Sequence, residues 1–164
     1  MKAIKKFLIK LYVVLFIRTR KVKWPDKSKN EFNRSMDSFS NRINEFPYKS
    51  DPLGGLIDYV DHPDNFFKED KTEGRDCDDW ARMWSLWGAL HDYKATEWIV
   101  CNPKRMFKTM HVITILEESR KFYLMNFRPY GPYSTEEEAL DRMRYFDSYK
   151  EDIIIVKSRS IEKG

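Results

Sequence analysis

Apolar positions predict helices in the first half of the chain and around residue 80. An apolar run from Phe7 to Ile17, interrupted by Lys10, predicts a first helix, which Pro25 ends because proline disfavours helical geometry in the residue before it. A second helix is expected from Ser28 to about Phe46, and a third from Asp76 to about His91 with acidic residues in its first turn. The second helix carries its apolar residues at spacings of 4, 3 and 4, namely Phe32, Met36, Phe39 and Ile43.

The second half of the chain predicts strands, because short apolar runs there are separated by polar turns. A helix is expected after the third of these strands, capped by Ser134 with Glu137 as its capping-box partner and continuing to about Tyr149. Between residues 47 and 74, prolines and glycines predict an irregular stretch of the kind that often carries function. The expected strands are Trp98–Cys101, Met110–Leu116, Phe122–Phe127 and Ile153–Val156.

Composition indicates a globular chain with an N-terminal appendage. Of the 164 residues 41% are hydrophobic and 15% aromatic, which excludes a disordered protein and allows one domain with a substantial core. Charge is divided unevenly: residues 1–34 hold 11 basic and 2 acidic residues, whereas the remainder is net acidic. We therefore expect a basic, apolar N-terminal helix over residues 1–23 and a separate globular domain over residues 24–164.

The N-terminal segment is consistent with several roles. Its apolar run is shorter than the roughly 20 residues that a membrane span needs. It is typical of a helix that lies on an anionic membrane surface or docks on a partner protein, and equally of a helix packed on its own domain. No small-residue cleavage site follows the run, which favours an intracellular or membrane-attached protein over a secreted one. Nucleic-acid binding is not expected, because the basic residues flank apolar ones instead of lining a polar face.

Three residues follow one another in the chain order of a thiol protease triad. Cys77 lies in the predicted first turn of the third helix, His111 begins a strand and Asn126 lies near the end of the next strand. In such a triad a thiolate attacks a carbonyl, an imidazole moves the proton and a third group orients the imidazole. The helix dipole at Cys77 would lower the thiol pKa, and the Cys77 N–H would be one oxyanion donor.

The two strands bring the imidazole and the amide together if their register is suitable. A hairpin centred between Glu118 and Ser119 would make His111 and Asn126 direct cross-strand neighbours, with Cβ atoms roughly 4.5 to 5.5 Å apart. Neither turn residue favours a positive φ, so a longer loop on the same centre is an alternative. A slip of one residue would place Met125 opposite His111 and separate the pair, because side chains alternate between the two faces.

Acidic residues surround the cysteine. The charges of Asp76, Asp78 and Asp79 oppose thiolate formation, and a bound cation would remove that conflict. The oxygen atoms of Asp76 and Asp78 suit Ca²⁺, although the same residues also serve simply as helix N-terminal charges. The thiol chemistry itself requires no cofactor.

Other roles for these residues remain open. Cys77 and Cys101 could form a disulfide in an oxidising compartment, but catalysis requires a reduced Cys77. A zinc site from Cys77, Cys101 and His111 lacks paired-ligand spacing. Taken singly, the cysteine could be a small buried hydrophobe, the histidine a satisfied polar group and Asn126 an ordinary strand end.

Four segments carry a resemblance to a known family. They resemble the bacterial transglutaminase-like cysteine proteinases, a branch of the papain-like superfamily, over residues 46 to 130. The stretch around the cysteine is the specific part of the match. The matching segments are Asp51–Val60 with Pro63 after it, Gly74–Ala81, His111–Leu116 and Leu124–Asn126.

The resemblance implies an α+β, papain-like core in which a helix carrying the cysteine packs on an antiparallel sheet carrying the histidine and the asparagine. It implies Cys77 as nucleophile, His111 as base and Asn126 as orienting residue, and Tyr59 is our candidate for an aromatic that assists the oxyanion. In some members acidic residues beside the cysteine bind calcium, which corresponds here to Asp76 and Asp78. The family usually has aspartate as third triad member, so Asn126 is a departure towards papain.

The sequence therefore predicts a thiol hydrolase that cleaves a peptide or amide bond of a protein or peptide substrate through a Cys77 thioester. The same thioester would serve an acyl transferase of the transglutaminase type, provided that an amine acceptor competes with water. A catalytically inactive domain that binds peptides is the non-enzymatic alternative, because a fold does not by itself fix a chemistry.

Overall fold

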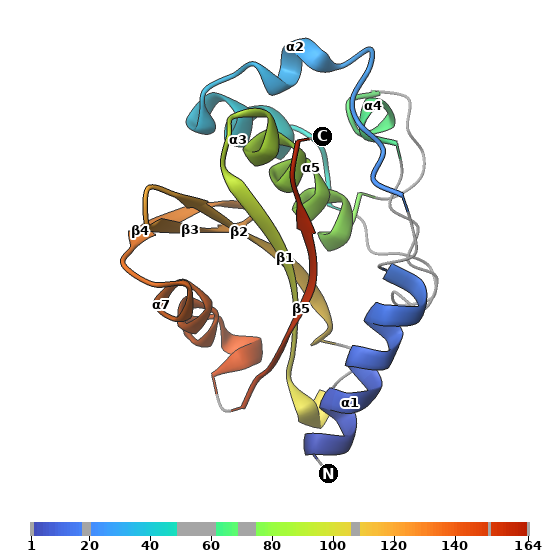
Figure 1. Ribbon diagram of the computed structural model, residues 1–164, viewed down its shortest axis with the longest axis vertical. Helices are drawn as coiled ribbons and strands as arrows, with labels where there is room; N and C mark the ends of the chain where they lie inside the picture. Colours follow the sequence, from blue (N-terminus) through green and yellow to red (C-terminus); the bar gives the residue numbers. More distant parts are fainter. Residues whose placement is uncertain are drawn as a thin grey trace.

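The computed structural model describes residues 2–17, 21–48, 62–68, 75–105, 109–150 and 152–163. A five-stranded antiparallel sheet, with strand order β4-β3-β2-β1-β5, is packed against helices on both faces (Figure 1). The α+β class expected from the sequence is confirmed. The strands are β1 Lys94–Cys101, β2 His111–Glu118, β3 Lys121–Asn126, β4 Arg128–Tyr133 and β5 Ile154–Ile161.

One face of the sheet carries the long helix α5, Cys77–Leu90. Its bounds agree with the predicted helix, with Asp76 as N-cap and His91 as C-cap. The helix is buried around almost its whole circumference, because the short helices cover the side that faces away from the sheet. These are α2 Lys29–Phe32, α3 Met36–Asn44 and α4 Pro63–Phe66.

Close packing and buried polar bonds fix α5 on strand β2. Gly88 faces Leu116 so closely that an added Cβ would lie 2.3 Å from the Leu116 Cδ2 atom. Nearer the N-terminus of the helix, Ala81 and Ser85 contact Thr114 of β2. The Thr114 hydroxyl donates to the Ala81 carbonyl at 2.7 Å and pairs with the Ser85 hydroxyl at 2.9 Å. These contacts run in the same direction along both elements, so α5 lies roughly parallel to β2.

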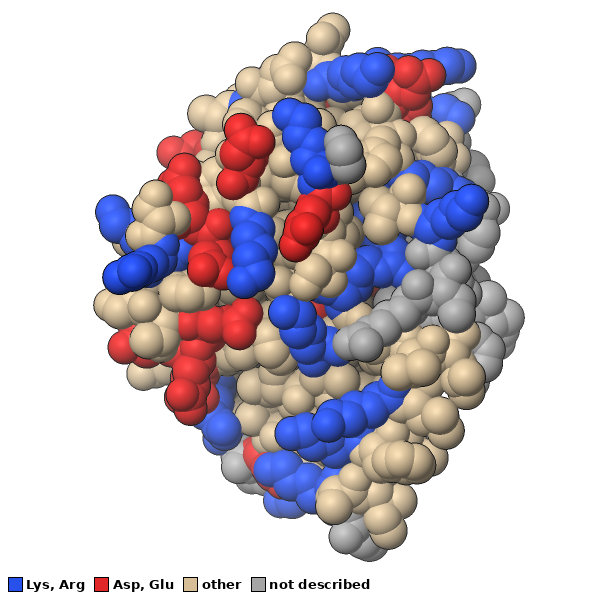
Figure 2. Space-filling view, in the orientation of Figure 1, with Lys and Arg blue, Asp and Glu red and all other residues tan. Residues whose placement is uncertain are grey.

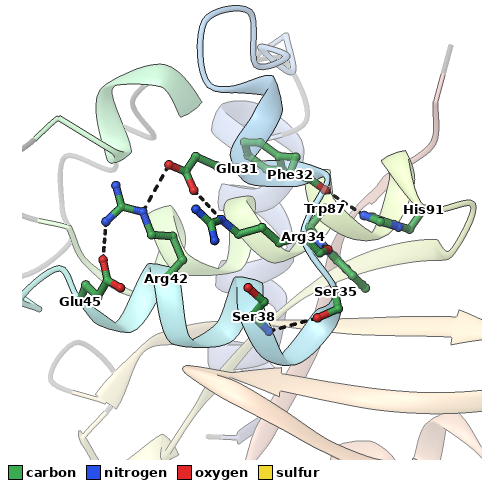
Figure 3. A network of polar contacts seen from close by, with 9 residues as sticks. All are labelled: Glu31, Phe32, Arg34, Ser35, Ser38, Arg42, Glu45, Trp87 and His91. Atoms are coloured by element: carbon green, nitrogen blue, oxygen red, sulfur yellow. Dashed lines mark hydrogen bonds and ion pairs between the residues drawn. The ribbon is translucent and has the colours of Figure 1, made fainter.

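The helix expected over residues 28–46 is two helices, α2 and α3, so this expectation is wrong in its continuity. Residues 33–35 interrupt it, and the Ser35 hydroxyl caps α3 by accepting from the Ser38 N–H (Figure 3). Backbone carbonyls at the break form hydrogen bonds with side chains at the C-terminal end of α5. Trp87 Nε1 donates to the Arg34 carbonyl at 2.9 Å, and Nε2 of the C-cap residue His91 lies 2.8 Å from the Phe32 carbonyl. Tertiary hydrogen bonds therefore outweigh helix continuity here.

The predicted apolar stripe of this segment survives the break. Phe32, Phe39 and Ile43 are fully buried against α5, and Met36 is half-buried against the same cluster. An ion-pair network on the outer side, Glu31 with Arg34 and Arg42, joins the two short helices (Figure 3).

The opposite face of the sheet is covered by α7, Glu136–Asp141, and the 3₁₀ turns η3 Arg142–Tyr145 and η4 Asp147–Tyr149. The expected cap is wrong by one residue. Thr135, not Ser134, caps the helix by accepting from the Glu138 N–H at 3.1 Å, and the Glu138 carboxylate accepts from the Ser134 N–H at 2.9 Å. The helix therefore has the side-chain cap of a capping box one position along the chain, whereas the Glu138 carboxylate binds the N–H of the residue before the cap.

Strand β4 was not expected, because its prolines and glycine are typical of a turn. It forms at the sheet edge, where the outer side of a strand needs no ladder donors and proline is tolerated. Strands β1 and β5 are also longer than the apolar runs that predicted them, since β1 begins at Lys94 and β5 continues to Ile161.

The β2–β3 hairpin has a different register from the expected one. Its turn is Ser119-Arg120, closed by the pair Glu118 and Lys121, and both turn residues have positive φ, 49° and 63°. This is the backbone geometry of a tight two-residue turn that twists with the sheet. The shift relative to the expected register is two residues, and a shift of two leaves each side chain on its expected face.

The N-terminal helix α1, Lys2–Tyr12, continues as a π-helical turn, η1, Val13–Ile17. It packs beside β5, on the sheet face that also carries α5 (Figure 1). The division of the chain at residue 23 stays a prediction.

Candidate active site

Cys77 is the first residue of α5 and is half-buried. The preceding residue, Asp76, caps the helix: its carboxylate accepts from the Asp78 N–H at 3.3 Å, and its carbonyl accepts from the Trp80 N–H at 3.2 Å. Cys77 therefore lies at the positive end of the helix dipole, in the turn whose N–H groups have no partner within the helix. This is the environment that stabilises a thiolate and a developing oxyanion.

His111 and Asn126 form a direct side-chain hydrogen bond. His111 Nε2 lies 2.7 Å from Asn126 Oδ1, although the two residues are not opposite each other in the observed register. An extension of the register places Ile113 opposite Asn126, so the bonded side chains lie diagonally on one face of the hairpin, within reach of long side chains. Because an amide oxygen only accepts, Nε2 carries the proton and Nδ1 is left as the basic nitrogen.

The surroundings of His111 favour the neutral imidazole. Burial lowers the pKa of His111, and the hydrogen bond to Asn126 acts in the opposite direction, raising it. The ring also stacks on Phe127 at a centroid distance of 5.6 Å. A neutral, oriented imidazole is the form that can accept a proton from a thiol.

The first turn of α5 and the start of β2 lie at the same level of the fold. Ala81 is bonded to Thr114, and α5 runs roughly parallel to β2. Four helical residues span about 6 Å and two strand residues about 7 Å, so Cys77 is roughly level with residue 112. The side chains of Thr114 and Leu116 face α5, whereas His111 alternates to the face that it shares with Ile113 and Ile115. Phe127 connects the two elements, because its ring packs on both Trp80, at 5.4 Å, and His111.

Tyr149 fixes the segment that leads into β2. Its hydroxyl donates to the Thr109 carbonyl at 3.0 Å, two residues before His111. Burial raises the pKa of Tyr149, and the charges of Cys77 and Cys101 raise it further. The sequence did not single out Tyr149, since no motif marks it.

No family model, curated protein or solved structure matches the chain. The chemistry of the site therefore follows from its own residues. Of the expected site residues, His111 and Asn126 are in contact, and Cys77 begins the helix whose Trp80 packs on Phe127 beside them. Tyr59 lies outside the described residues.

The acidic residues around Cys77 are largely buried. Ligand atoms of Asp76, Cys77 and Asp78 lie within 4.8 Å of one another, and the Asp78 Oδ2 atom is buried without a hydrogen-bond partner. Two carboxylates with an unsatisfied oxygen fit a hard cation, whereas the thiol does not. Of these residues, Asp76 and Asp78 could therefore hold Ca²⁺.

Arg75 offsets part of this negative charge without any metal. It is buried, its Nε donates to the Phe66 carbonyl at 2.6 Å, and its guanidinium lies 4.3 Å from the centre of the Phe46 ring. Burial lowers the pKa of Arg75, and the neighbouring Asp79 raises it. The conflict between the carboxylates and a thiolate is therefore smaller than the sequence suggested, because the Arg75 charge acts on Asp79.

Cys101 belongs to a different part of the molecule. It is fully buried against α1, and burial raises the pKa of its thiol to about 11. Both cysteines are free, so the disulfide alternative is not realised. Among the described residues, Cys77, Cys101 and His111 do not form a group that could share a metal, which removes the zinc alternative.

A groove of about 710 Å³ opens beside the hydrogen-bonded pair. It is lined by residues of α3 and β4 together with Asn126, Phe127 and Phe146, whereas Cys77 and His111 do not line it. Its remaining lining residues are mostly polar, namely Asp37, Ser40, Asn41, Asn44, Arg128, Pro129 and Tyr130. Residues from α3, β3 and β4 thus converge on a cavity of the size that ligand sites usually have.

Proposed function

We propose that the protein is a thiol hydrolase that cleaves a peptide or amide bond through a thioester on Cys77. The observation that supports the proposal is the hydrogen bond of 2.7 Å between His111 Nε2 and Asn126 Oδ1, beside Phe127, whose ring also packs on Trp80 in the first turn of the cysteine helix. A cysteine at a helix N-terminus and an imidazole with a fixed tautomer are the two components that nucleophilic thiol catalysis needs.

In the proposed reaction His111 Nδ1 takes the proton of the Cys77 thiol, and the sulfur attacks the carbonyl carbon of the scissile bond. The negative charge moves to the carbonyl oxygen, where the Cys77 N–H donates to it. Collapse of this intermediate breaks the carbon–nitrogen bond, and the imidazolium gives its proton to the leaving amine. Water, deprotonated by the same imidazole, then attacks the thioester, releasing the acid and the thiol.

The groove beside Asn126 is the proposed position of the substrate. An extended peptide could lie between α3 and β4, with backbone amides within reach of polar side chains such as Asn41 and Asn44. The arrangement also supports a papain-like core, in which the cysteine helix packs on the sheet that carries the histidine. Calcium held by Asp76 and Asp78 would supply positive charge beside Cys77 and is part of the same proposal.

The proposal is tested by incubating the purified chain with a peptide library derived from a proteome and identifying new termini by mass spectrometry. New termini should appear with the wild type and with Cys101→Ser, which is the matched control, and not with Cys77→Ser. Equal yields from wild type and Cys77→Ser would contradict the proposal. A fluorescent primary amine in the same reaction distinguishes acyl transfer, since its incorporation into peptides at the expense of hydrolysis identifies a transferase.

A further inference from the structure

Helix α1 has two apolar sides, and the sheet covers only one. Ile9 and Val13 are 4% and 1% exposed and pack against a cluster that includes Ile99 and Val156. On the other side a second set of large apolar side chains is 43% to 64% exposed. These are Ile4, Phe7, Leu8, Leu11, Val14 and Leu15.

The exposed set forms a continuous stripe. Its members recur at spacings of three and four residues, so they lie on one side of the helix along its whole length. Only two other large apolar side chains in the described part of the chain are exposed, Tyr48 and Tyr145. Apolar exposure is therefore concentrated on this one surface, and a concentrated patch marks an interaction site.

Basic residues border the stripe. Lys6 and Lys10 are exposed and lie one turn apart on α1. Lys5 donates to the Pro103 carbonyl at 2.5 Å, which brings the exposed basic residues of η2, Pro103–Arg105, beside the helix. Figure 2 shows the outer side of α1 as apolar or uncharged surface with Lys and Arg side chains next to it. No acidic residue precedes Asp26 in the chain.

We propose that α1 binds the surface of an anionic phospholipid membrane, lying flat with its exposed stripe among the acyl chains and its lysines at the lipid phosphates. The apolar stripe with basic borders matches this environment in both chemistry and charge. A second copy of the helix is a poorer match, since it would bring lysines together without acidic partners. Among the described residues, none of the helices has both the length and the apolar character to span a bilayer.

The test is sedimentation of the full chain with vesicles of phosphatidylcholine alone or of two parts phosphatidylcholine to one part phosphatidylserine. We expect binding to the anionic vesicles only, weakened by salt because exposed charges are screened. Phe7→Asp/Leu11→Asp should reduce the partition coefficient about tenfold or more, since it puts charge into the stripe that would enter the acyl chains. Lys6→Gln/Lys10→Gln should cost about fivefold for each lysine.

Tyr145→Asp is the matched control, because it places the same charge at an exposed aromatic residue away from α1 and should leave binding unchanged. Melting curves of all variants establish that they fold. Absence of binding to anionic vesicles overturns the proposal. So does a wild-type dimer in light scattering that Phe7→Asp/Leu11→Asp converts to monomer, since the stripe would then be covered by a second copy.

Discussion

At the scale of single residues, the candidate site depends on one imidazole whose surroundings fix its tautomer and its charge. Asn126 is buried and accepts from Nε2, so the basic Nδ1 is defined before a substrate arrives. The same hydrogen bond raises the pKa of His111 against the lowering effect of burial. Asn126 thus orients the ring and adjusts its basicity, while Cys77 carries the covalent step.

This division of roles predicts unequal effects of substitution. Cys77→Ala should abolish turnover, whereas Asn126→Ala should reduce kcat/KM by roughly 100-fold, within the range attributed to positioned proton transfer. Loss of the hydrogen bond also lowers the pKa of His111, so the acidic limb of the pH–rate profile should move to lower pH. Complete loss of activity in both variants would show that Asn126 does more than orient the imidazole.

The partly buried imidazole also affects stability. The pKa of His111 is lowered in the folded state, so the unfolded chain binds the proton more readily. The free energy of unfolding therefore decreases as the pH falls below the unfolded pKa of about 6.5. His111→Gln removes this titration. Urea unfolding at several pH values should show wild type losing stability relative to His111→Gln below about pH 6.5. A constant difference between the two across this range would contradict a partly buried, neutral His111.

At the scale of helices and strands, the sequence predicted α5 almost to the residue because local signals agree there. Asp76 is a good N-cap, and acidic residues occupy the first turn. The continuous helix over 28–46 was wrong because Trp87 and His91 bind carbonyls at the break, and such bonds leave no local signal.

The predicted hairpin register was wrong because residues of the types of Ser119 and Arg120 rarely adopt the positive φ that this turn requires. His111 and Asn126 nevertheless stayed on one face, because the register moved by two residues and side-chain direction repeats every two residues.

The contact between α5 and β2 yields a prediction for Gly88. A Cβ there would lie 2.3 Å from Leu116 Cδ2, so the fully buried Leu116 side chain would have to shift within the core. Gly88→Ala should therefore destabilise the protein by about 1 to 3 kcal/mol, in spite of the higher helix propensity of alanine. Urea unfolding measures the change. An unchanged or raised midpoint would mean that α5 is not packed as closely as the contact indicates.

At the scale of the whole molecule, the sheet carries the candidate site and the proposed membrane surface on one frame. Ala95 and Ile99 lie on the same face of β1, the first packed in the α5 cluster and the second in the α1 cluster. A membrane-bound molecule would hold its candidate site at a fixed distance from the bilayer.

Calcium would act on the stability of the whole molecule. If Asp76 and Asp78 hold the ion in the folded state only, saturating Ca²⁺ should raise the melting temperature, and a chelator should reverse the change. Asp78→Asn should remove the response, whereas Asp141→Asn, an exposed carboxylate in α7, should keep it. Identical melting curves with calcium and with chelator would remove calcium from the account.

The pH dependence of iodoacetamide alkylation, followed by peptide mass spectrometry for both cysteines, tests the central claim most directly. Cys77 should react quickly well below about pH 8 and lose that reactivity in His111→Ala, because a thiolate next to an imidazole is the reactive species. Cys101, whose pKa is raised to about 11, should react slowly in both proteins. Equal and ordinary titration of Cys77 in wild type and His111→Ala would contradict a nucleophile and base pair and leave a domain that binds without catalysing.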